Sequence, residues 1–348
     1  MHRRTFRATL TALTLALAAF GVAACGSSNS SSTSSTSSTA SSGKKIKVGL
    51  VTDIGGLNDR SFNHLADVGL MDAQSKLGAQ GRVLESHSDA DYIPNLTTLA
   101  SQHYDLVIGV GFLMADAVDT VAKKFPNTKF AIIDSDVTTM KGKPQNVEGL
   151  LFKEQEAGYL VGYLSGLYAK DNKITTVSSV GGQKIPPVDH YIAGFQAGAK
   201  KADPSIKTLN AYSQDFVDQA KCKELALNQI AQGSKVVFQV AGACGLGALD
   251  AAKEKSVQGI GVDADQAYIG PQVFTSALKK VDVAVYDAIK GVQGGAYKGG
   301  QDVTSTVAND GIGYGKLNAT AQKYATQVKK VKSEIASGQI SNIPDTVK

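Results

Sequence analysis

The amino-acid sequence predicts an α/β protein with two lobes, each built around a doubly wound parallel sheet. Short runs rich in β-branched residues alternate with helical stretches, an alternation typical of parallel strands that are connected by helices. Gly and Asp bound these runs, and the whole series occurs twice along the chain. About 300 residues follow the N-terminal segments, which is more than one hydrophobic core usually serves.

The order of the runs predicts each element. In the first series, strands are expected at residues 46–51, 82–86, 104–110, 130–133 and 147–152, with helices at 60–76 and from Ile93 onward. The second series begins with a helix over residues 153–169, because its apolar residues recur at helical spacing. Next come strands at 174–179, 206–211, 236–240, 259–262 and 273–278, a helix at 279–289, a strand at 303–307 and a last amphipathic helix that carries Tyr324, Val328, Val331 and Ile335.

Two similar halves followed by extra elements predict two lobes joined by a hinge that the chain crosses several times. The N-terminal lobe is expected to comprise residues 46–150 and about 276–310. The C-terminal lobe is expected to comprise residues 151–275 and about 311–348.

The N-terminal segment has the features of a bacterial export signal. Three arginines in the first seven residues precede an uncharged, mostly apolar stretch from Leu10 to Val22. This stretch is shorter than the roughly 20 residues that a membrane-spanning helix needs. Small residues before Cys25 predict cleavage ahead of that cysteine and lipidation of its thiol. Residues 1–24 are therefore predicted to be a lipoprotein signal peptide, which places the mature protein on the extracytoplasmic face of the cell membrane.

Residues 25–45 are predicted to be a linker, because Ser, Thr, Ala and Gly dominate them and such a composition buries too little apolar surface to fold. Of the 36 basic residues five lie in the first 45 positions, which leaves 31 basic and 31 acidic residues in the body. A neutral body argues against nucleic-acid binding, for which a basic face is the usual footprint.

Polar residues follow several of the predicted strands. Asp53, Asp134 and Asp263 each come just after an apolar run, and Gly182 lies in the first loop of the second lobe. Ligands of open α/β sheets bind at the carboxyl ends of the strands. One such Asp alone usually caps a helix, but three together favour a polar rim that accepts hydrogen bonds from the hydroxyl groups of a ligand.

The loop at residues 53–63 is the most distinctive stretch, with paired glycines and a polar string. Asp59 or Ser61 is expected to cap the helix that follows. Phe62 is either first-turn core or a ring on which a flat ligand stacks, and Phe216 occupies the same kind of loop in the second lobe. One aromatic ring from each lobe would sandwich a planar base.

Few features of the body favour catalysis. Its four histidines belong to no recognised catalytic or zinc-binding motif. The glycine-rich pattern at residues 242–247 is better explained by a tight strand-to-helix turn than by dinucleotide binding. Cys222 and Cys244 fall in neighbouring βα loops, so a disulfide is favoured over two separate thiols, and a metal site is disfavoured. No cofactor or metal is expected, although a nucleoside-processing enzyme stays as an alternative.

Several long motifs, in order, resemble the basic membrane protein family of lipid-anchored binding proteins, over nearly all of residues 46 to 348. The matching stretches are 53–63, 104–112, 154–159, 181–182 with Pro186, 194–198, 261–266 and 275–282. The best-understood members bind purine nucleosides for an ABC-type importer. The resemblance therefore implies a type I periplasmic-binding-protein-like fold, a nucleoside ligand, an importer permease as partner and a monomeric protein.

The resemblance also implies roles for single residues. Asp53 would lie near the edge of the base, Phe62 and Phe216 would stack on it, and Lys279 would reach into the cleft. Asp134 and Asp263 would meet the polar groups of the ligand, and Asn63 and Gly182 complete the expected set. His64 and the cysteine pair depart from the family pattern and leave the selectivity of the cleft open. A sugar-binding or a sensory receptor of the same fold is the alternative.

Overall fold

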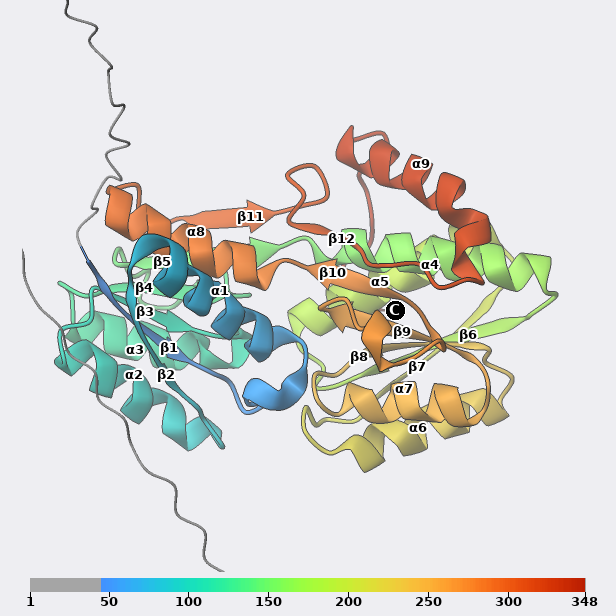
Figure 1. The fold of residues 1–348 in the computed structure, drawn as a ribbon, viewed down its shortest axis with the longest axis horizontal. Helices are drawn as coiled ribbons and strands as arrows, with labels where there is room; N and C mark the ends of the chain where they lie inside the picture. Colours follow the sequence, from blue (N-terminus) through green and yellow to red (C-terminus); the bar gives the residue numbers. More distant parts are fainter. Residues whose placement is uncertain (1–44, 348) are drawn as a thin grey trace, which may run out of the picture. The chain divides into compact units, whose positions relative to one another are not determined.

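The computed structural model describes residues 45–347, which form two α/β lobes as the sequence predicts (Figure 1). The predicted signal peptide, the lipidation site Cys25 and nearly all of the linker lie outside these residues. No helix within the described range is long and apolar enough to cross a membrane.

The first lobe contains a six-stranded sheet in which every strand pair is parallel. In spatial order its strands are β11 (Asp302–Ser305), β5 (Val147–Phe152), β4 (Lys129–Ile133), β3 (Leu106–Gly109), β1 (Lys47–Val51) and β2 (Gln80–Leu84). Helices α1 (Phe62–Leu77) and α8 (Val281–Gly294) pack together, and α2 (Tyr92–Ser101) packs with α3 (Ala115–Lys124). The strands alternate between these helix pairs, since Ile108 joins the core around α1 and α8 and Val107 the core around α2 and α3.

The second lobe repeats this plan. Its strands are, in spatial order, β12 (Ile312–Tyr314), β10 (Val273–Lys279), β9 (Gln258–Asp263), β8 (Val236–Val240), β6 (Thr176–Gly181) and β7 (Lys207–Tyr212). Only the short β12, which the sequence did not predict, pairs in antiparallel direction. The helices are α4 (Glu154–Asp171), α5 (Pro186–Ala202), α6 (Gln219–Ala231), α7 (Gly245–Glu254) and α9 (Ala325–Ala336), of which α9 packs on α4.

Helices α4 and α5 approach each other unusually closely. A Cβ atom at Gly158 of α4 would overlap the carbonyl oxygen of Tyr191 on α5, so only glycine allows this spacing. The close approach sets the position of Tyr191, because it holds the backbone of this residue against α4.

The chain passes between the two sheets three times, after Phe152, after Lys279 and after Ser305. Because Leu278 still pairs with Asp263 in the second sheet, the return to the first lobe comes later than the expected position near residue 276. For the same reason α8 begins at Val281 and not at Lys279, where the sequence placed its start.

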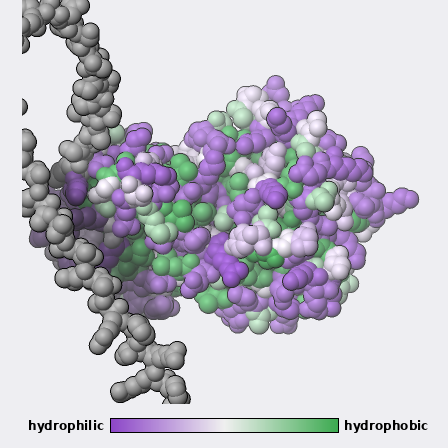
Figure 2. Space-filling view, in the orientation of Figure 1, coloured by the Kyte–Doolittle hydropathy of each residue, from purple (hydrophilic) through white to green (hydrophobic). Residues whose placement is uncertain are grey.

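Hydrophilic residues cover most of the face drawn in Figure 2, with apolar residues in small areas between them.

Candidate functional site between the lobes

A pocket lies where the carboxyl ends of the two sheets face each other. It is lined from the first lobe by Asp53, Asp59, Phe62, Asn63, Gly111 and Asp134, among others, and from the second by Tyr191, Phe216, Gly242, Asp263 and Lys279, among others. The space between these atoms measures about 590 Å³, a volume that includes open solvent.

Asp53 follows β1 and is held by its own loop. Its Oδ1 accepts hydrogen bonds from Asn63 Nδ2 at 2.7 Å and from the Gly55 amide at 2.9 Å. The other oxygen, Oδ2, takes part in none of the hydrogen bonds seen among residues 45–347 and lies beside Gly111, where a side chain would crowd it. Burial raises the pKa of Asp53 to about 6, although both hydrogen bonds favour the ionised form.

Of the two residues that the sequence offered as the cap of the helix, the structure selects Asp59. Asp59 caps α1, because its carboxylate accepts hydrogen bonds from the backbone amides of Asn63 at 2.8 Å and His64 at 3.1 Å. The Ser61 hydroxyl is thereby free to point across the cleft. It donates to Asp263 Oδ2 at 2.8 Å and lies 3.1 Å from the carbonyl oxygen of Val262.

Asp263 ends β9 with a positive φ of 59°, a conformation that Asp tolerates better than most residues. Its Oδ1 accepts a hydrogen bond of 3.0 Å from the hydroxyl of Tyr191, while Oδ2 is bound by Ser61 of the other lobe. Burial raises the pKa of this carboxyl group, and Lys279 opposes the shift. Backbone strain and a buried charge in one residue are typical of a functional site.

Lys279 lies at the end of β10 and is 2 % exposed. Its Nζ is 2.6 Å and 2.7 Å from the two carboxylate oxygens of Asp134 and 2.9 Å from Glu154 Oε1. The ammonium group also lies 5.0 Å from the centre of the Phe62 ring and 4.8 Å from that of Phe152. Both rings therefore face a cation that is already paired.

This charge cluster continues to His190, whose Nδ1 lies 3.0 Å from Glu154 Oε2. Burial raises the pKa of Asp134 to about 7, whereas Lys279 and His190 hold the pKa of Glu154 below its usual value. The neighbouring carboxylates hold Lys279 in its charged form, with a raised pKa. The two carboxyl groups of the cluster thus differ, since the pKa of Asp134 is raised and that of Glu154 is lowered.

The two loop aromatics both line the pocket. Phe62 is the first residue of α1, and it packs against the core as well as facing the cavity. Phe216 comes from the loop between β7 and α6. A Cβ atom at Gly182 would overlap the Phe216 ring, so Gly182 supports this ring from behind without lining the cavity itself.

The structure brings seven of the predicted site residues to one pocket, namely Asp53, Phe62, Asn63, Asp134, Phe216, Asp263 and Lys279. The helix-capping role of Asp59 was one of the two options that the sequence offered. Sequence reasoning missed the parts played by Ser61, Tyr191 and Glu154 in the site. Glu154 stands in one of the matched motifs, but nothing in the local pattern of Tyr191 separates it from ordinary helix core.

Cys222 and Cys244 form a disulfide with their Cα atoms 5.5 Å apart. No cluster of three or more potential metal ligands occurs within residues 45–347.

The site is rich in acceptors and poor in free donors. Asp53, Asp59, Asp134 and Asp263 contribute four carboxyl groups, and Lys279 is the only cation among the residues that line the pocket. Such a set suits a neutral or cationic ligand that carries hydroxyl or amino hydrogens, and it opposes the entry of an anion.

Comparisons with known proteins agree along the whole described body. A family model for PnrA-like ABC transporter substrate-binding proteins matches residues 46–346. An uncharacterized lipoprotein of Pyrococcus horikoshii is 38 % identical over 304 residues, which covers 83 % of this chain and 74 % of that protein. The ABC transporter nucleoside-binding protein BmpA of Lactococcus lactis is 34 % identical over 318 residues, which covers 85 % of this chain and 88 % of BmpA.

Solved structures show the same fold. The crystal structure of an ABC transporter solute-binding protein from Aeropyrum pernix superposes with a TM-score of 0.77 at 28 % identity, and it covers 86 % of this chain and 94 % of its own. The lobe architecture predicted from the sequence is thereby confirmed.

Proposed function

The chain belongs to the PnrA-like family of ABC transporter substrate-binding proteins, and we propose that it captures a nucleoside between its lobes and delivers it to the importer. A substrate-binding protein of this family acts by capture and release and is not an enzyme. The observation that carries the proposal is the meeting of one aromatic ring from each lobe with three strand-end carboxyl groups in a single pocket.

The two kinds of side chain fit the two parts of a nucleoside. Phe62 and Phe216 offer apolar ring faces, on which a purine or pyrimidine base stacks. Asp53, Asp134 and Asp263 are acceptors, and the hydroxyls of a ribose or the amino and imino hydrogens of a base are donors. The name of the Lactococcus relative, a nucleoside-binding protein, supports the same ligand class.

The charge of the pocket favours a nucleoside over a nucleotide. A phosphate group would enter among four carboxyl groups, and the single pocket cation is already paired with Asp134 and Glu154. A phosphate group and these carboxylates carry like charges, which repel each other strongly in a partly buried site. The proposed ligand is therefore uncharged.

The proposed location is the extracytoplasmic face of the membrane, with lipid on Cys25. The signal-like sequence before this cysteine supports it, and so does the lipoprotein name of the Pyrococcus relative. Mass spectrometry of protein extracted from membranes tests this part, because an unmodified N-terminus would contradict it.

Calorimetric titration of residues 46–348 tests the ligand class. The series comprises adenosine, guanosine, inosine, cytidine, ribose and inosine 5′-monophosphate. At least one nucleoside is expected to bind more tightly than ribose and more tightly than the monophosphate. Ribose binding as tight as that of every nucleoside would reject the stacked base and indicate a sugar receptor. Chromatography of the ligand after incubation would reveal an enzyme.

A further inference from the structure

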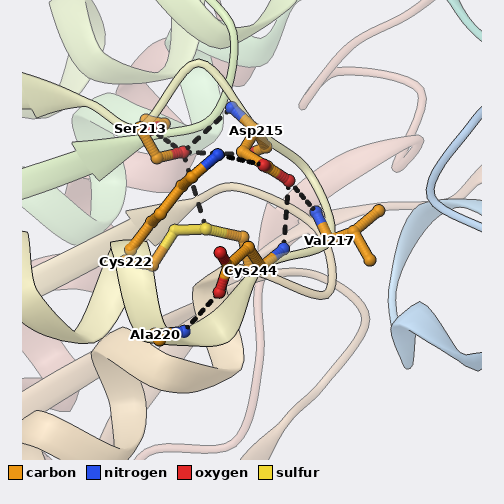
Figure 3. Close-up of polar contacts among 9 residues, drawn as sticks. Ser213, Asp215, Val217, Ala220, Cys222 and Cys244 are labelled. Carbon is orange, nitrogen blue, oxygen red and sulfur yellow. Dashed lines mark hydrogen bonds and ion pairs between the residues drawn. A yellow bond between two sulfur atoms is a disulfide. The ribbon is translucent and has the colours of Figure 1, made fainter.

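The loop that carries Phe216, residues 213–218, joins the edge strand β7 to α6 and is built around Asp215 (Figure 3). Asp215 Oδ1 accepts hydrogen bonds from the amides of Val217 at 2.8 Å and Asp218 at 3.0 Å. Its own amide donates to Ser213 Oγ at 3.2 Å, and Lys221 pairs with its Oδ2 at 2.7 Å. These contacts shape the loop, but all of them lie within the segment from Ser213 to Lys221.

The loop is anchored to the rest of the lobe at two places. At its start, the amides of Ser213 and Gln214 donate hydrogen bonds of 2.8 Å and 3.1 Å to the carbonyl oxygens of Gly181 and Gly182. Further along, Phe216 is tied to the lobe through Cys244. The backbone amide of Cys244 donates a hydrogen bond of 3.0 Å to the carbonyl oxygen of Phe216, and Ser213 Oγ lies 3.5 Å from Cys244 Sγ. The disulfide then joins Cys244 to Cys222 in the first turns of α6. Figure 3 shows the bond directly beneath the loop.

These connections form a closed ring. From Phe216 the chain runs six residues forward to Cys222, crosses the disulfide to Cys244, and returns to Phe216 through the backbone hydrogen bond. The middle of the loop has few remaining degrees of freedom, because the carbonyl group of Phe216 and the first turn of α6 are both tied to the same point at the start of α7.

We propose that the Cys222–Cys244 disulfide positions Phe216, so that the aromatic wall of the second lobe is already in place before the ligand arrives. The inference rests on the proposed function only in taking Phe216 as a wall for a base. Holding a contact residue in its bound position reduces the ordering cost of binding.

The environment of the bond indicates a permanent clamp and not a redox switch. Both cysteines are fully buried, and they pack in an apolar cluster with Val180, Ala226 and Val237. A reductant in solution has no access to a disulfide in such a site without local unfolding. The cross-link therefore acts on geometry and leaves the ligand contacts to Phe216.

The test compares four proteins in a double-mutant cycle: wild type, Phe216→Ala, Cys222→Ala with Cys244→Ala, and all three substitutions together. Inosine is the probe, and calorimetry gives the dissociation constant of each protein. Alanine is chosen because the two positions are apolar in character. Cys222→Ala alone, which breaks the same bond and keeps Cys244, is the second variant if the paired substitution does not fold.

With Phe216 present, loss of the disulfide is expected to raise the dissociation constant about 3- to 10-fold, the scale of ordering one interface side chain. With Phe216→Ala, the same loss is expected to change it less than 2-fold, since coupled residues do not add. Equal losses in both backgrounds would show that the bond acts only on general stability and would overturn the proposal.

Hydrogen exchange of the Val217, Asp218 and Cys244 amides provides a readout without ligand. Exchange at these sites should speed up when the disulfide is removed, while the amides of β8 keep their protection. Unchanged exchange would also overturn the proposal. If wild-type protein binds no nucleoside, the proposed function fails, whereas the exchange comparison still decides whether the disulfide orders the loop.

Discussion

Ser61 of the first lobe donates a hydrogen bond of 2.8 Å to Asp263 of the second, across 202 residues of sequence. The structure therefore shows the lobes in a closed arrangement, in which a buried carboxylate is satisfied by the opposite wall. Gln266 Nε2, 3.4 Å from the carbonyl oxygen of Arg60, adds a second contact between the same two loops.

Replacing Ser61 with alanine should favour the open form of the unliganded protein. The variant leaves a carboxylate oxygen of Asp263 without its donor, and a hydrogen bond to a charged group contributes about 1.5–3 kcal/mol. Small-angle X-ray scattering should show a larger radius of gyration than for wild type. Ser101→Ala, which removes a hydroxyl bonded within its own helix, should leave the radius unchanged. A radius equal to that of wild type in Ser61→Ala would exclude a closing role for this contact.

Phe62→Ala should weaken nucleoside binding by about 1–3 kcal/mol, the scale of base stacking on an aromatic side chain. Binding of free ribose should change much less, because the sugar does not contact the ring in the proposed arrangement. Paired calorimetric titrations with inosine and ribose give both numbers. A similar loss for the two ligands would point to a damaged pocket in place of lost stacking.

Asp53 should make stability depend on pH in a definite direction. Its pKa is about 6 in the folded protein and 3.8 for the free side chain. Between these values the folded state binds a proton that the unfolded chain has released, so the free energy of unfolding falls as the pH rises. Relative to Asp53→Asn, wild type should lose about 2–3 kcal/mol between pH 4 and pH 7, at about 1.4 kcal/mol per unit.

Urea unfolding of wild type and Asp53→Asn at four pH values between 4 and 7 measures this difference. Asn keeps an oxygen that accepts the hydrogen bonds of Gly55 and Asn63. The exposed Asp116→Asn serves as control and should follow wild type at every pH. A difference that stays constant, or grows in the opposite direction, would refute the assignment to Asp53.

Lys279→Met should destabilise the protein by about 3–5 kcal/mol, because it leaves the carboxylates of Asp134 and Glu154 buried without their cation. Lys280→Met provides a matched control. Lys280 pairs with Asp310 at the surface, where an ion pair contributes about 1 kcal/mol or less. Thermal and urea unfolding compare the two variants, and equal effects would contradict the buried role of Lys279.

Gly182→Ala should displace the Phe216 ring and raise the dissociation constant for a nucleoside about 10-fold or more, since the new methyl group overlaps that ring. Gly294→Ala adds the same methyl group where no atom lies within 4 Å, and it should leave binding unchanged. Calorimetry on both variants, after their folded state is checked by circular dichroism, separates a local effect from a general one. Normal affinity in Gly182→Ala would mean that Phe216 does not depend on this glycine.

Most strands could be predicted because they are mainly apolar runs, and several of them, such as β3, β6 and β9, end in Gly or Asp. The exception, β12, has only three residues, one of them glycine, and its pairing with β10 is a tertiary contact that no local pattern announces. The extension of β10 to Lys279 was missed for a similar reason, since a lysine at a strand end reads as a surface residue until its two carboxylate partners are known.

Site residues that come directly after a strand could be predicted, whereas site residues that act through contacts across the cleft could not. Asp53, Asp134 and Asp263 were accessible to reasoning because the position after a parallel strand is itself informative. Ser61 and Tyr191 could not be predicted as site residues, because each acts through a hydrogen bond to Asp263. Asp263 lies 202 residues from Ser61 and 72 residues from Tyr191 in the chain.

The return of the chain to the first sheet bears on how this protein reaches its native state. Strand β11 and helix α8 belong to the first lobe, yet they follow all of β6 to β10 in the sequence. A polypeptide that emerges N-terminus first cannot complete its first lobe until the main strands of the second lobe have emerged. The N-terminal half of the chain thus remains incompletely folded, with apolar surface exposed, until the C-terminal third supplies α8 and β11. A chain that ends before β11 therefore contains an incomplete first sheet, and the two lobes cannot fold strictly one after the other.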